Sequence, residues 1–206
     1  TLSIAQGEFT SFAGPSGSGK TTLLNLIGCL DKPTSGDILL EGRSLSQLSK
    51  VQLADVRKQK IGFIFQSYNL IPVLTAYENV EFSLALLGGL SSKEIKRRVT
   101  SMLDAVGLKG LYDRKPQDLS GGQQQRVAIA RALVKEPKIV LADEPTANLD
   151  SETGEAIIKL MQKMNREQNV TFIFSTHDPM VMRYATRLIV IRDGHIEKDE
   201  RGGSNA

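Results

Sequence analysis

The chain has 206 residues, of which 40% are hydrophobic and 24% charged, and this suits one large domain or a domain with a subdomain. No apolar stretch is long enough to span a bilayer and no signal peptide opens the chain, so we expect a cytoplasmic protein unless a partner holds it at a membrane. The single cysteine excludes an internal disulfide, and the net charge of +3 indicates a solvated surface more than a nucleic-acid footprint.

The first part of the chain alternates short apolar runs with glycine-containing turns. Residues 2–4 and 9–13 alternate loosely between apolar and polar types, which is typical of two strands separated by a turn at Gly7. A helix is expected over residues 20–28, because leucine and isoleucine there are available for burial. Further strands are expected at residues 38–40 and 61–65.

Residues 76–118 differ from the rest, because they contain no strand-like run. Apolar residues recur at helical spacing over residues 76–87 and 93–106, and Gly88 and Gly107 interrupt the pattern. We therefore expect a helical insertion within an α/β domain.

After this insertion, apolar runs of strand length alternate with helical segments. Helices are expected at residues 122–135 and 151–168, strands at residues 139–142 and 171–174, and a hairpin turn at Asp193 and Gly194. Such alternation predicts a mostly parallel sheet with helices on both faces. The predicted organisation is one domain over residues 1–206, with its core at about 1–75 and 119–200, a helical subdomain at about 76–118 and a flexible tail at 201–206.

A glycine-rich loop joins the strand at residues 9–13 to the helix that follows it. Its sequence fits the pattern G-x-x-x-x-G-K-[ST], in which backbone N–H groups cradle phosphate oxygens at a helix N-terminus. Lys20 would reach the β- and γ-phosphates of a nucleotide, and the Thr21 hydroxyl would bind Mg²⁺. The strand–loop–helix context disfavours the alternative, a plain turn with a solvated lysine. The candidate phosphate-binding residues are Gly14, Ser16, Gly17, Ser18, Gly19, Lys20, Thr21 and Thr22.

Asp143 and Glu144 end a buried apolar run, at the edge of the sheet where open α/β folds bind ligands. Asp143 would hold Mg²⁺, directly or through water, and Glu144 would polarise an attacking water as general base. Adjacent acids before Pro145 would also suit a helix or turn cap, but the phosphate loop elsewhere in the chain favours catalysis.

The segment from Ser120 to Gln123 has two explanations. Ser120 and Gln123 have the spacing of a capping box. Gly121 and Gly122 weaken a helix start, however, and leave backbone N–H groups open to an anion. Because the domain already has one phosphate loop, we expect this second site to serve a nucleotide held by another copy of the chain.

Four more polar residues stand where strands, turns or helices end. His177 follows a buried strand whose end should lie near that of Asp143, which favours a catalytic role over a purely structural one. Gln66 follows another strand, and its amide would ligate Mg²⁺ and orient water unless it is simply solvated. Asp150 could be no more than a helix N-cap, and His195 beside the hairpin turn receives no role.

The ordered set of motifs resembles that of the nucleotide-binding subunit of ABC transporters, over essentially the whole chain. Residues 14–22 resemble the Walker A loop of that family, Gln66 its Q-loop and residues 119–125 its signature. Residues 139–144 resemble Walker B, residues 147–150 the D-loop and His177 the switch histidine.

The resemblance implies a P-loop NTPase of the ABC-ATPase fold, with a mostly parallel central sheet, an antiparallel β subdomain and a helical subdomain insertion. It implies an ATPase with ATP and Mg²⁺ as cofactors. Glu144, His177 and Gln66 would be the catalytic residues, and Thr21, Gln66 and Asp143 would hold the metal.

The resemblance also implies partners. Two copies would dimerise head-to-tail, with each ATP between the Walker A loop of one copy and the signature of the other. A transmembrane permease subunit would dock on the helical subdomain near Gln66, which places the chain in the cytoplasm, peripheral on the inner face of the membrane. No specific nucleic acid is expected. Besides the Walker A residues, those that the resemblance assigns to cofactor binding are Ser120, Gly121, Gly122, Gln123 and Asp150.

Within the family, residues 28–36 and 65–72 resemble the LolD/MacB group, which drives lipoprotein release or macrolide and peptide export. A non-transport ATPase, associated with cell division or with nucleic acid and translation, is the alternative. The short helical insertion and single cassette disfavour the nucleic-acid and translation types, and intact Lys20, Glu144 and His177 disfavour a non-hydrolysing module. Family members also have an adenine-stacking aromatic upstream of Walker A, which we expect to precede Thr1.

Overall fold

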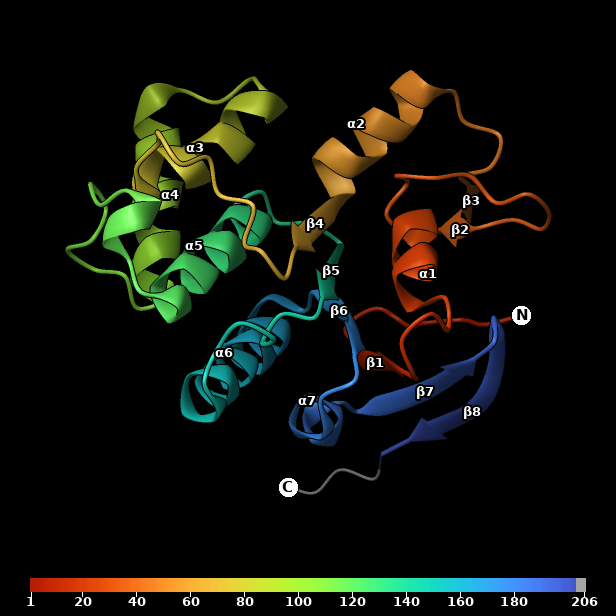
Figure 1. The fold of residues 1–206 in the computed structure, drawn as a ribbon. Helices are drawn as coiled ribbons and strands as arrows, with labels where there is room; N and C mark the ends of the chain where they lie inside the picture. Colours follow the sequence, from red (N-terminus) through yellow and green to blue (C-terminus); the bar gives the residue numbers. More distant parts are fainter. Residues whose placement is uncertain (203–206) are drawn as a thin grey trace.

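The structure is a computed structural model that describes residues 1–202, and its centre is a six-stranded sheet (Figure 1). The strands lie in the order β4-β5-β6-β1-β7-β8. The first five in this order run parallel, and β8 runs antiparallel to β7, so the mostly parallel sheet expected from the sequence is confirmed. The strands are β1 (Phe9–Ala13), β4 (Ile61–Ile64), β5 (Ile139–Asp143), β6 (Thr171–Thr176), β7 (Arg187–Arg192) and β8 (His195–Arg201).

A second, two-stranded sheet is antiparallel. It pairs β2 (Leu39–Leu40) with β3 (Arg43–Ser44). The two residues between these strands, Glu41 and Gly42, have φ angles of 52° and 76°. Two consecutive positive φ angles are what a tight two-residue hairpin requires, because its twist then matches that of the strands. The sequence pattern predicted a strand at residues 38–40 but not β3.

Helices cover both faces of the main sheet (Figure 1). On one side α1 contacts β5 and β6, and on the other α5 contacts β4. The helices α3, α4 and α5 contact one another and gather on one side of the molecule in Figure 1. No helix in residues 1–202 combines the length and apolar content needed to cross a membrane. The helices are α1 (Lys20–Ile27), α2 (Lys50–Lys60), α3 (Ala76–Leu87), α4 (Ser92–Ala105), α5 (Gly121–Leu133), α6 (Ser151–Gln168) and α7 (Pro179–Tyr184), with a 3₁₀ turn at Pro116–Asp118.

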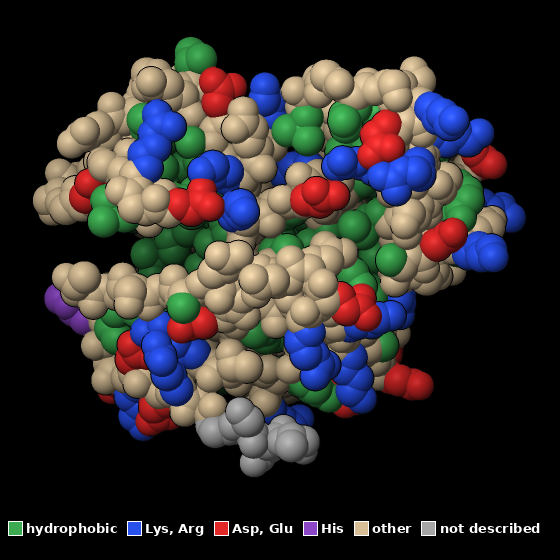
Figure 2. Space-filling model, turned by 180° about the vertical axis from the view of Figure 1, so that it is seen from behind, with side chains coloured by type: hydrophobic (Ala, Val, Ile, Leu, Met, Phe, Trp, Pro, Cys, Tyr) green, Lys and Arg blue, Asp and Glu red, His purple; other side chains and the backbone are tan. Residues whose placement is uncertain are grey.

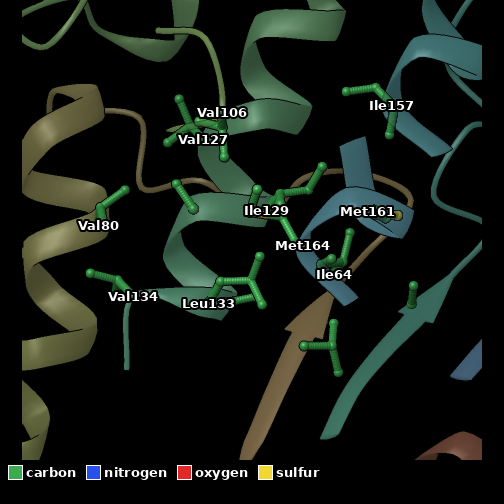
Figure 3. Close-up of a cluster of buried hydrophobic side chains, with 14 of the residues drawn as sticks. Ile64, Val80, Val106, Val127, Ile129, Leu133, Val134, Ile157, Met161 and Met164 are labelled. Carbon is green, nitrogen blue, oxygen red and sulfur yellow. The ribbon is translucent and has the colours of Figure 1, made fainter. Parts of the chain in front are cut away.

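Two apolar clusters hold the layers together. The larger cluster includes Ile129 of α5 and Met161 of α6, and Figure 3 shows part of it. Strand β6 contributes to both clusters, because successive side chains of a strand point to opposite faces of the sheet. Phe172 and Phe174 enter the larger cluster, and Ile173 enters the smaller one beside α1. Each fully buried side chain of this size contributes about 1.5–3 kcal/mol to folding.

The start of α3 is fixed by local hydrogen bonds. Thr75 and Glu78 form a capping box, and the helix predicted at residues 76–87 is confirmed. The buried side chain of Asn79 donates to the carbonyls of Ile71, Leu74 and Thr75 at 2.9–3.2 Å and accepts the Ile71 N–H at 2.8 Å. One amide therefore secures the loop that leads from β4 to the helices α3 and α4.

One sequence expectation about the first 60 residues is wrong, and one helix was missed. Residues 2–4 form no strand in the described structure; their backbone is held by Arg187, whose Nη1 donates to the Ser3 carbonyl at 2.6 Å. No element was predicted over Lys50–Lys60, where α2 forms. Its signal was the capping box of Ser49 with Gln52, because α2 buries few apolar side chains.

The C-terminal hairpin is longer than expected. Strand β8 continues to Arg201, and the Gly202 N–H donates to the Thr186 carbonyl at 2.9 Å, so the predicted tail at 201–206 is wrong for its first two residues. The rest of that tail, residues 203–206, lies outside the described residues.

Candidate functional site

The glycine-rich loop between β1 and α1 has a backbone that only glycine adopts easily. Gly14, Gly17 and Gly19 have φ angles of 150°, 79° and 99°. A Cβ on Gly14 would lie 2.1 Å from the Ile191 carbonyl oxygen of β7, which leaves no room for a side chain. The loop is therefore shaped by conformational freedom at two glycines and by close packing at the third.

Lys20 begins α1 and folds back over this loop. Its ammonium group donates to the carbonyls of Gly14 at 2.8 Å and Pro15 at 2.9 Å, and its side chain is buried. Gly19 occupies the N-cap, and no side chain in residues 1–202 caps this helix start. The N–H groups of the first turn and the lysine thus remain as donors for an anion.

A cavity of about 610 Å³ opens beside the loop, at the carboxyl ends of β4, β5 and β6. It brings together the predicted phosphate loop, the acidic pair, Gln66 and His177, which come from four parts of the sequence. The lining residues are Pro15, Ser16, Gly17, Gly19, Lys20, Thr21, Thr22, Gln66, Asp143, Glu144, Ala147, Ser175 and His177. Gly14 and Ser18 of the predicted set lie in the loop but not on this surface.

Thr21 and Asp143 lie next to each other in the wall of the cavity. The Thr21 hydroxyl lies 3.4 Å and 3.2 Å from the two carboxylate oxygens of Asp143. A hydroxyl and a carboxylate in contact form an oxygen-rich pair, which is the donor type that Mg²⁺ prefers. The two residues are 122 positions apart, so the contact depends on β5 running beside β6 and below α1.

Glu144 follows β5 in a strained conformation. Its φ of 44° is left-handed, which costs a residue with a Cβ roughly 1–2 kcal/mol. The carbonyl of Ser175 accepts its N–H at 2.9 Å, and the Thr176 hydroxyl donates to its Oε2 at 3.1 Å. His177 places Nδ1 2.6 Å from Oε1. Strain of this kind persists only where neighbours hold it, and here they are three consecutive residues at the end of β6.

Gln66 follows β4 with its side chain exposed at the cavity, and the backbone around it is held from two sides. Asn148 Nδ2 donates to the Gln66 carbonyl at 2.9 Å. Arg131 of α5 donates to the Tyr68 carbonyl at 2.7 Å and to the carbonyl of Asn69. Burial of this guanidinium lowers the pKa of Arg131. Tyr68 and Asn69 have φ angles of 59° and 50°, so the arginine secures a strained turn.

The segment from Ser120 to Gln123 starts α5. The capping box is confirmed: the Gln123 N–H donates to the Ser120 hydroxyl at 3.3 Å, and the Ser120 N–H donates to Gln123 Oε1 at 2.9 Å. A Cβ on Gly121 would lie 2.9 Å from the Tyr68 hydroxyl oxygen, and one on Gly122 would lie 2.5 Å from the Thr153 methyl carbon. A side chain at either glycine would thus displace Tyr68 or Thr153, a reason for glycine that the sequence did not suggest.

These four residues do not reach the phosphate-loop cavity of their own chain. Neither Ser120, Gly121, Gly122 nor Gln123 is among the described residues that line it. Asp150 lies outside it as well and caps α6, with its Oδ1 accepting the Thr153 N–H at 2.9 Å. That hydrogen bond lowers the pKa of Asp150. The structure therefore separates the predicted site residues into two groups.

Sequence reasoning missed the residues that support the site. Asn148 and Gln125 lie within segments that resemble family motifs, residues 147–150 and 119–125, but neither was assigned a role of its own; the buried Gln125 donates from Nε2 to the Pro145 carbonyl at 2.6 Å. Thr176 and Arg131 had no sequence signal beyond their place at the end of a strand and on a helix. Their partners are 20 or more positions away, so only the fold identifies them.

The family comparison agrees with this arrangement. The family model described as ABC transporter matches residues 1–147. The chain belongs to the ABC transporter family. The ATPase class and the ABC-ATPase fold predicted from the motifs are thereby confirmed, the fold by the solved structures described next.

Three relatives with similar sequences are an uncharacterized ATP-binding protein and two proteins named for a transport role. An uncharacterized ABC transporter ATP-binding protein, MJ0796 of Methanocaldococcus jannaschii, is 49% identical over 97% of this chain and 86% of its own length. The lipoprotein-releasing system ATP-binding protein LolD 1 of Chlorobium chlorochromatii is 48% identical over 98% and 82%. The macrolide export ATP-binding/permease protein MacB of Syntrophobacter fumaroxidans is 48% identical over 97% of this chain, which spans only 28% of that relative.

Solved structures match closely. A dimeric, post-hydrolysis structure of the MJ0796 cassette bound to ADP and Pi has a TM-score of 0.88 at 49% identity, covering 97% of this chain and 88% of that one. CbiO1 of Clostridium perfringens has a TM-score of 0.90 at 34% identity, covering 97% and 79%.

Proposed function

We propose that two copies of this chain bind MgATP head-to-tail, hydrolyse it and thereby drive a membrane permease. The observation that carries the proposal is the separation of the site residues. The phosphate loop, Asp143, Glu144 and His177 line one cavity, whereas the segment from Ser120 to Gln123 at the start of α5 lies outside it. A second copy would bring its own α5 to the open side of that cavity. The MJ0796 cassette, which this chain resembles, forms a dimer in its solved structures.

In the proposed site, backbone N–H groups of residues 16–20 and the ammonium of Lys20 bind the β- and γ-phosphates. Lys20 donates to two loop carbonyls in the structure, and phosphate oxygens would take over those hydrogen bonds. Ser16, Ser18 and Thr22 complete the loop. From the other copy, the hydroxyl of Ser120 and the N–H groups of Gly121 and Gly122 would contact the γ-phosphate, and the Gln123 N–H would join them by exchanging its hydrogen bond to the Ser120 hydroxyl. Asp150 would act near that interface through its fixed position at the start of α6.

The residues at the cavity fit Mg²⁺. Thr21 and Asp143 already place oxygen atoms 3.2–3.4 Å apart, and the Gln66 side chain lies on the same surface. Bound there, Mg²⁺ would neutralise charge that develops on the phosphates. It needs only one or two carboxylates besides substrate phosphates, which is what this donor set offers.

Glu144 would accept a proton from the attacking water, and His177 would hold the Glu144 carboxylate or the γ-phosphate. Glu144 is suited to this because it lines the cavity and both its carboxylate oxygens lie within hydrogen-bond distance of fixed groups, the Thr176 hydroxyl and Nδ1 of His177. A positioned base of this kind contributes about 10²–10⁴-fold to a rate.

A groove of about 490 Å³ near the segment after β4 supports docking of a permease. Phe63 and Phe65 line it with stacked rings, 5.6 Å apart and 2° from parallel. Its described lining includes the basic residues Arg57, Lys58, Arg131 and Lys135 and no acidic side chain. An apolar, basic groove next to Gln66 would let a partner act on the catalytic site. Docked in this way, the chain would be cytoplasmic and peripheral on the inner face of the membrane.

The relatives named for lipoprotein release and macrolide export support a transporter of the lipoprotein-release or macrolide/peptide export type. No tight nucleic-acid binding is part of the proposal. On the face drawn in Figure 2, basic side chains are interspersed with acidic ones, and a cleft with hydrophobic side chains at its floor divides the surface. Nucleic-acid affinity depends on releasing counterions at a concentrated basic stripe, which this face lacks.

Mixing two inactive variants tests the proposal. Lys20→Ala removes the ammonium group of the phosphate loop, and Ser120→Arg places a bulky side chain at the start of α5 where the γ-phosphate should bind. A homodimer of either variant therefore has no intact site. In an equal mixture, half the dimers contain one of each, and one of their two sites pairs an intact loop with an intact signature. ATPase activity should therefore return to about a quarter of the parent value. If each chain completes its own site, the mixture stays inactive.

A further inference from the structure

The end of β6 holds Glu144 at three separate points. The Ser175 carbonyl accepts its N–H at 2.9 Å, the Thr176 hydroxyl donates to Oε2 at 3.1 Å, and His177 Nδ1 lies 2.6 Å from Oε1. The first contact fixes the backbone and the other two fix the carboxylate. Of the two side chains, His177 is 73% exposed and Thr176 is fully buried, so water competes with the histidine and not with the threonine.

The hydrogen bonds of Thr176 determine where its proton points. Its Oγ1 accepts the N–H of Asp178 at 3.0 Å. A threonine hydroxyl has one proton to donate, and in the described structure Glu144 Oε2 is its acceptor. The hydroxyl is therefore a directed donor to one carboxylate oxygen, not a freely rotating group.

Asp178 is itself fixed. It is the N-cap of α7, where its Oδ1 accepts the Met180 N–H at 2.8 Å. Its Oδ2 lies 3.4 Å from the hydroxyl of Thr146, two residues beyond Glu144. The hydrogen bonds thus form a closed path from Glu144 through Thr176 and Asp178 to Thr146, and back along the chain.

From these contacts we propose that Thr176 is a positioning residue for hydrolysis, which holds the Glu144 carboxylate toward the cavity. The proposal rests on the assignment of Glu144 as general base. Glu144 has a left-handed backbone, so its side chain direction depends on neighbours that hold it. Without the Thr176 hydroxyl, only the exposed His177 would orient the carboxylate.

The substitution Thr176→Val keeps the shape of the side chain and removes the hydroxyl. We expect the kcat of ATP hydrolysis to fall by about 10-fold or more, since a misplacement of about 1 Å can cost about 100-fold. The KM for ATP should stay within about threefold, because Thr176 is not among the described residues that line the cavity. Thr176→Ser, which keeps the donor, should restore kcat to within about threefold of the parent.

The control is Thr171→Val, at the other end of the same strand. Thr171 is also buried, and its hydroxyl also accepts one backbone N–H, that of Gly7 at 3.0 Å. Both valine variants lose the acceptor of a backbone N–H, and Thr176→Val also loses the donor to Glu144 Oε2, so its melting temperature should fall at least as far as that of Thr171→Val. Only Thr176→Val should lose kcat. If Thr176→Val melts below the assay temperature, Thr176→Ala is measured in its place, and its kcat should fall by about 10-fold or more as well.

A double variant shows whether Thr176 acts through Glu144. In a Glu144→Gln background, where the base is already absent, Thr176→Val should lower single-turnover hydrolysis by less than about twofold further. A further loss as large as in the parent would mean that Thr176 acts independently, which would overturn the proposal.

The outcomes separate this proposal from the one on which it rests. If Glu144→Gln hydrolyses ATP like the parent, the assignment of the base fails. If Glu144→Gln is inactive while Thr176→Val keeps the parent kcat, the base stands and the role of Thr176 is refuted. Equal losses of kcat in Thr176→Val and Thr171→Val, or a Thr176→Ser variant as slow as the valine, would also refute it.

Discussion

Replacing Glu144 with glutamine should separate ATP binding from hydrolysis. In the structure Oε2 accepts the Thr176 hydroxyl at 3.1 Å and Oε1 lies 2.6 Å from Nδ1 of His177. A glutamine oxygen can keep the first contact, and its NH₂ can donate to Nδ1 when that nitrogen carries no proton. The substitution should therefore preserve the shape of the site while removing the group that accepts a proton from water.

The expected loss is that of a positioned base. Turnover should fall by about 10²–10⁴-fold, which corresponds to about 2.7–5.4 kcal/mol in the activation barrier. Affinity for ATP should not fall, since one negative charge near the γ-phosphate is removed. In the proposed mechanism hydrolysis opens the closed dimer, so the variant should accumulate as a dimer with MgATP.

Three measurements check this prediction: single-turnover hydrolysis, calorimetric ATP affinity, and gel filtration with and without MgATP. Glu152→Gln is the matched control, because Glu152 is exposed in the first turn of α6 and is not part of the cavity lining described. Turnover of Glu144→Gln within about tenfold of the parent would refute the role of base. A variant that stays monomeric with saturating MgATP would contradict the paired site.

Further predictions concern stability. Burial lowers the pKa of Lys135 to about 8, so between about pH 8 and about pH 10 the unfolded chain binds more protons than the folded chain. The free energy of unfolding should therefore rise with pH over that range. Urea unfolding at several pH values should show this rise in the parent and not in Lys135→Met. Arg187 is buried and donates to Asp199 at 2.7 Å and to Glu8 at 3.0 Å. Arg187→Met should therefore lower the free energy of unfolding by about 3 kcal/mol, because it leaves two carboxylates without their partner. A loss under about 1 kcal/mol, typical of an exposed ion pair, would contradict this role.

The sequence predicted most elements because their signals are local. The helix α6 was predicted with the bounds it has, since its apolar positions repeat at helical spacing over 18 residues. The helix α2 was missed, because Leu53 and Val56 are its only buried side chains among many polar residues. Residues 2–4 have the alternation of a strand, but alternation does not supply a neighbouring strand with which to form hydrogen bonds.

For the candidate site, as for the fold, the sequence contains the local signals but not the contacts between distant residues. Residue types and spacing predicted which side chains would lie near one another, since the phosphate loop, Asp143, Glu144, Gln66 and His177 each follow a strand or start a helix on one edge of the sheet. The contacts between them were not predictable. Thr21 meets Asp143 over 122 positions, and Asn148 meets the Gln66 carbonyl over 82, so both depend on how the strands are ordered and how α1 and the loop after β5 pack.

The glycines at the start of α5 illustrate what the structure adds to a motif. The sequence suggested that they serve an anion, and the structure adds that a Cβ on Gly121 or Gly122 would displace Tyr68 or Thr153. The two explanations are compatible, because a glycine leaves room for its neighbours and puts no side chain over its own N–H group. Glycine alone therefore does not identify a phosphate site at α5. What favours one is that this helix start lies outside the cavity of its own chain, so that any nucleotide it contacts would be bound by another molecule.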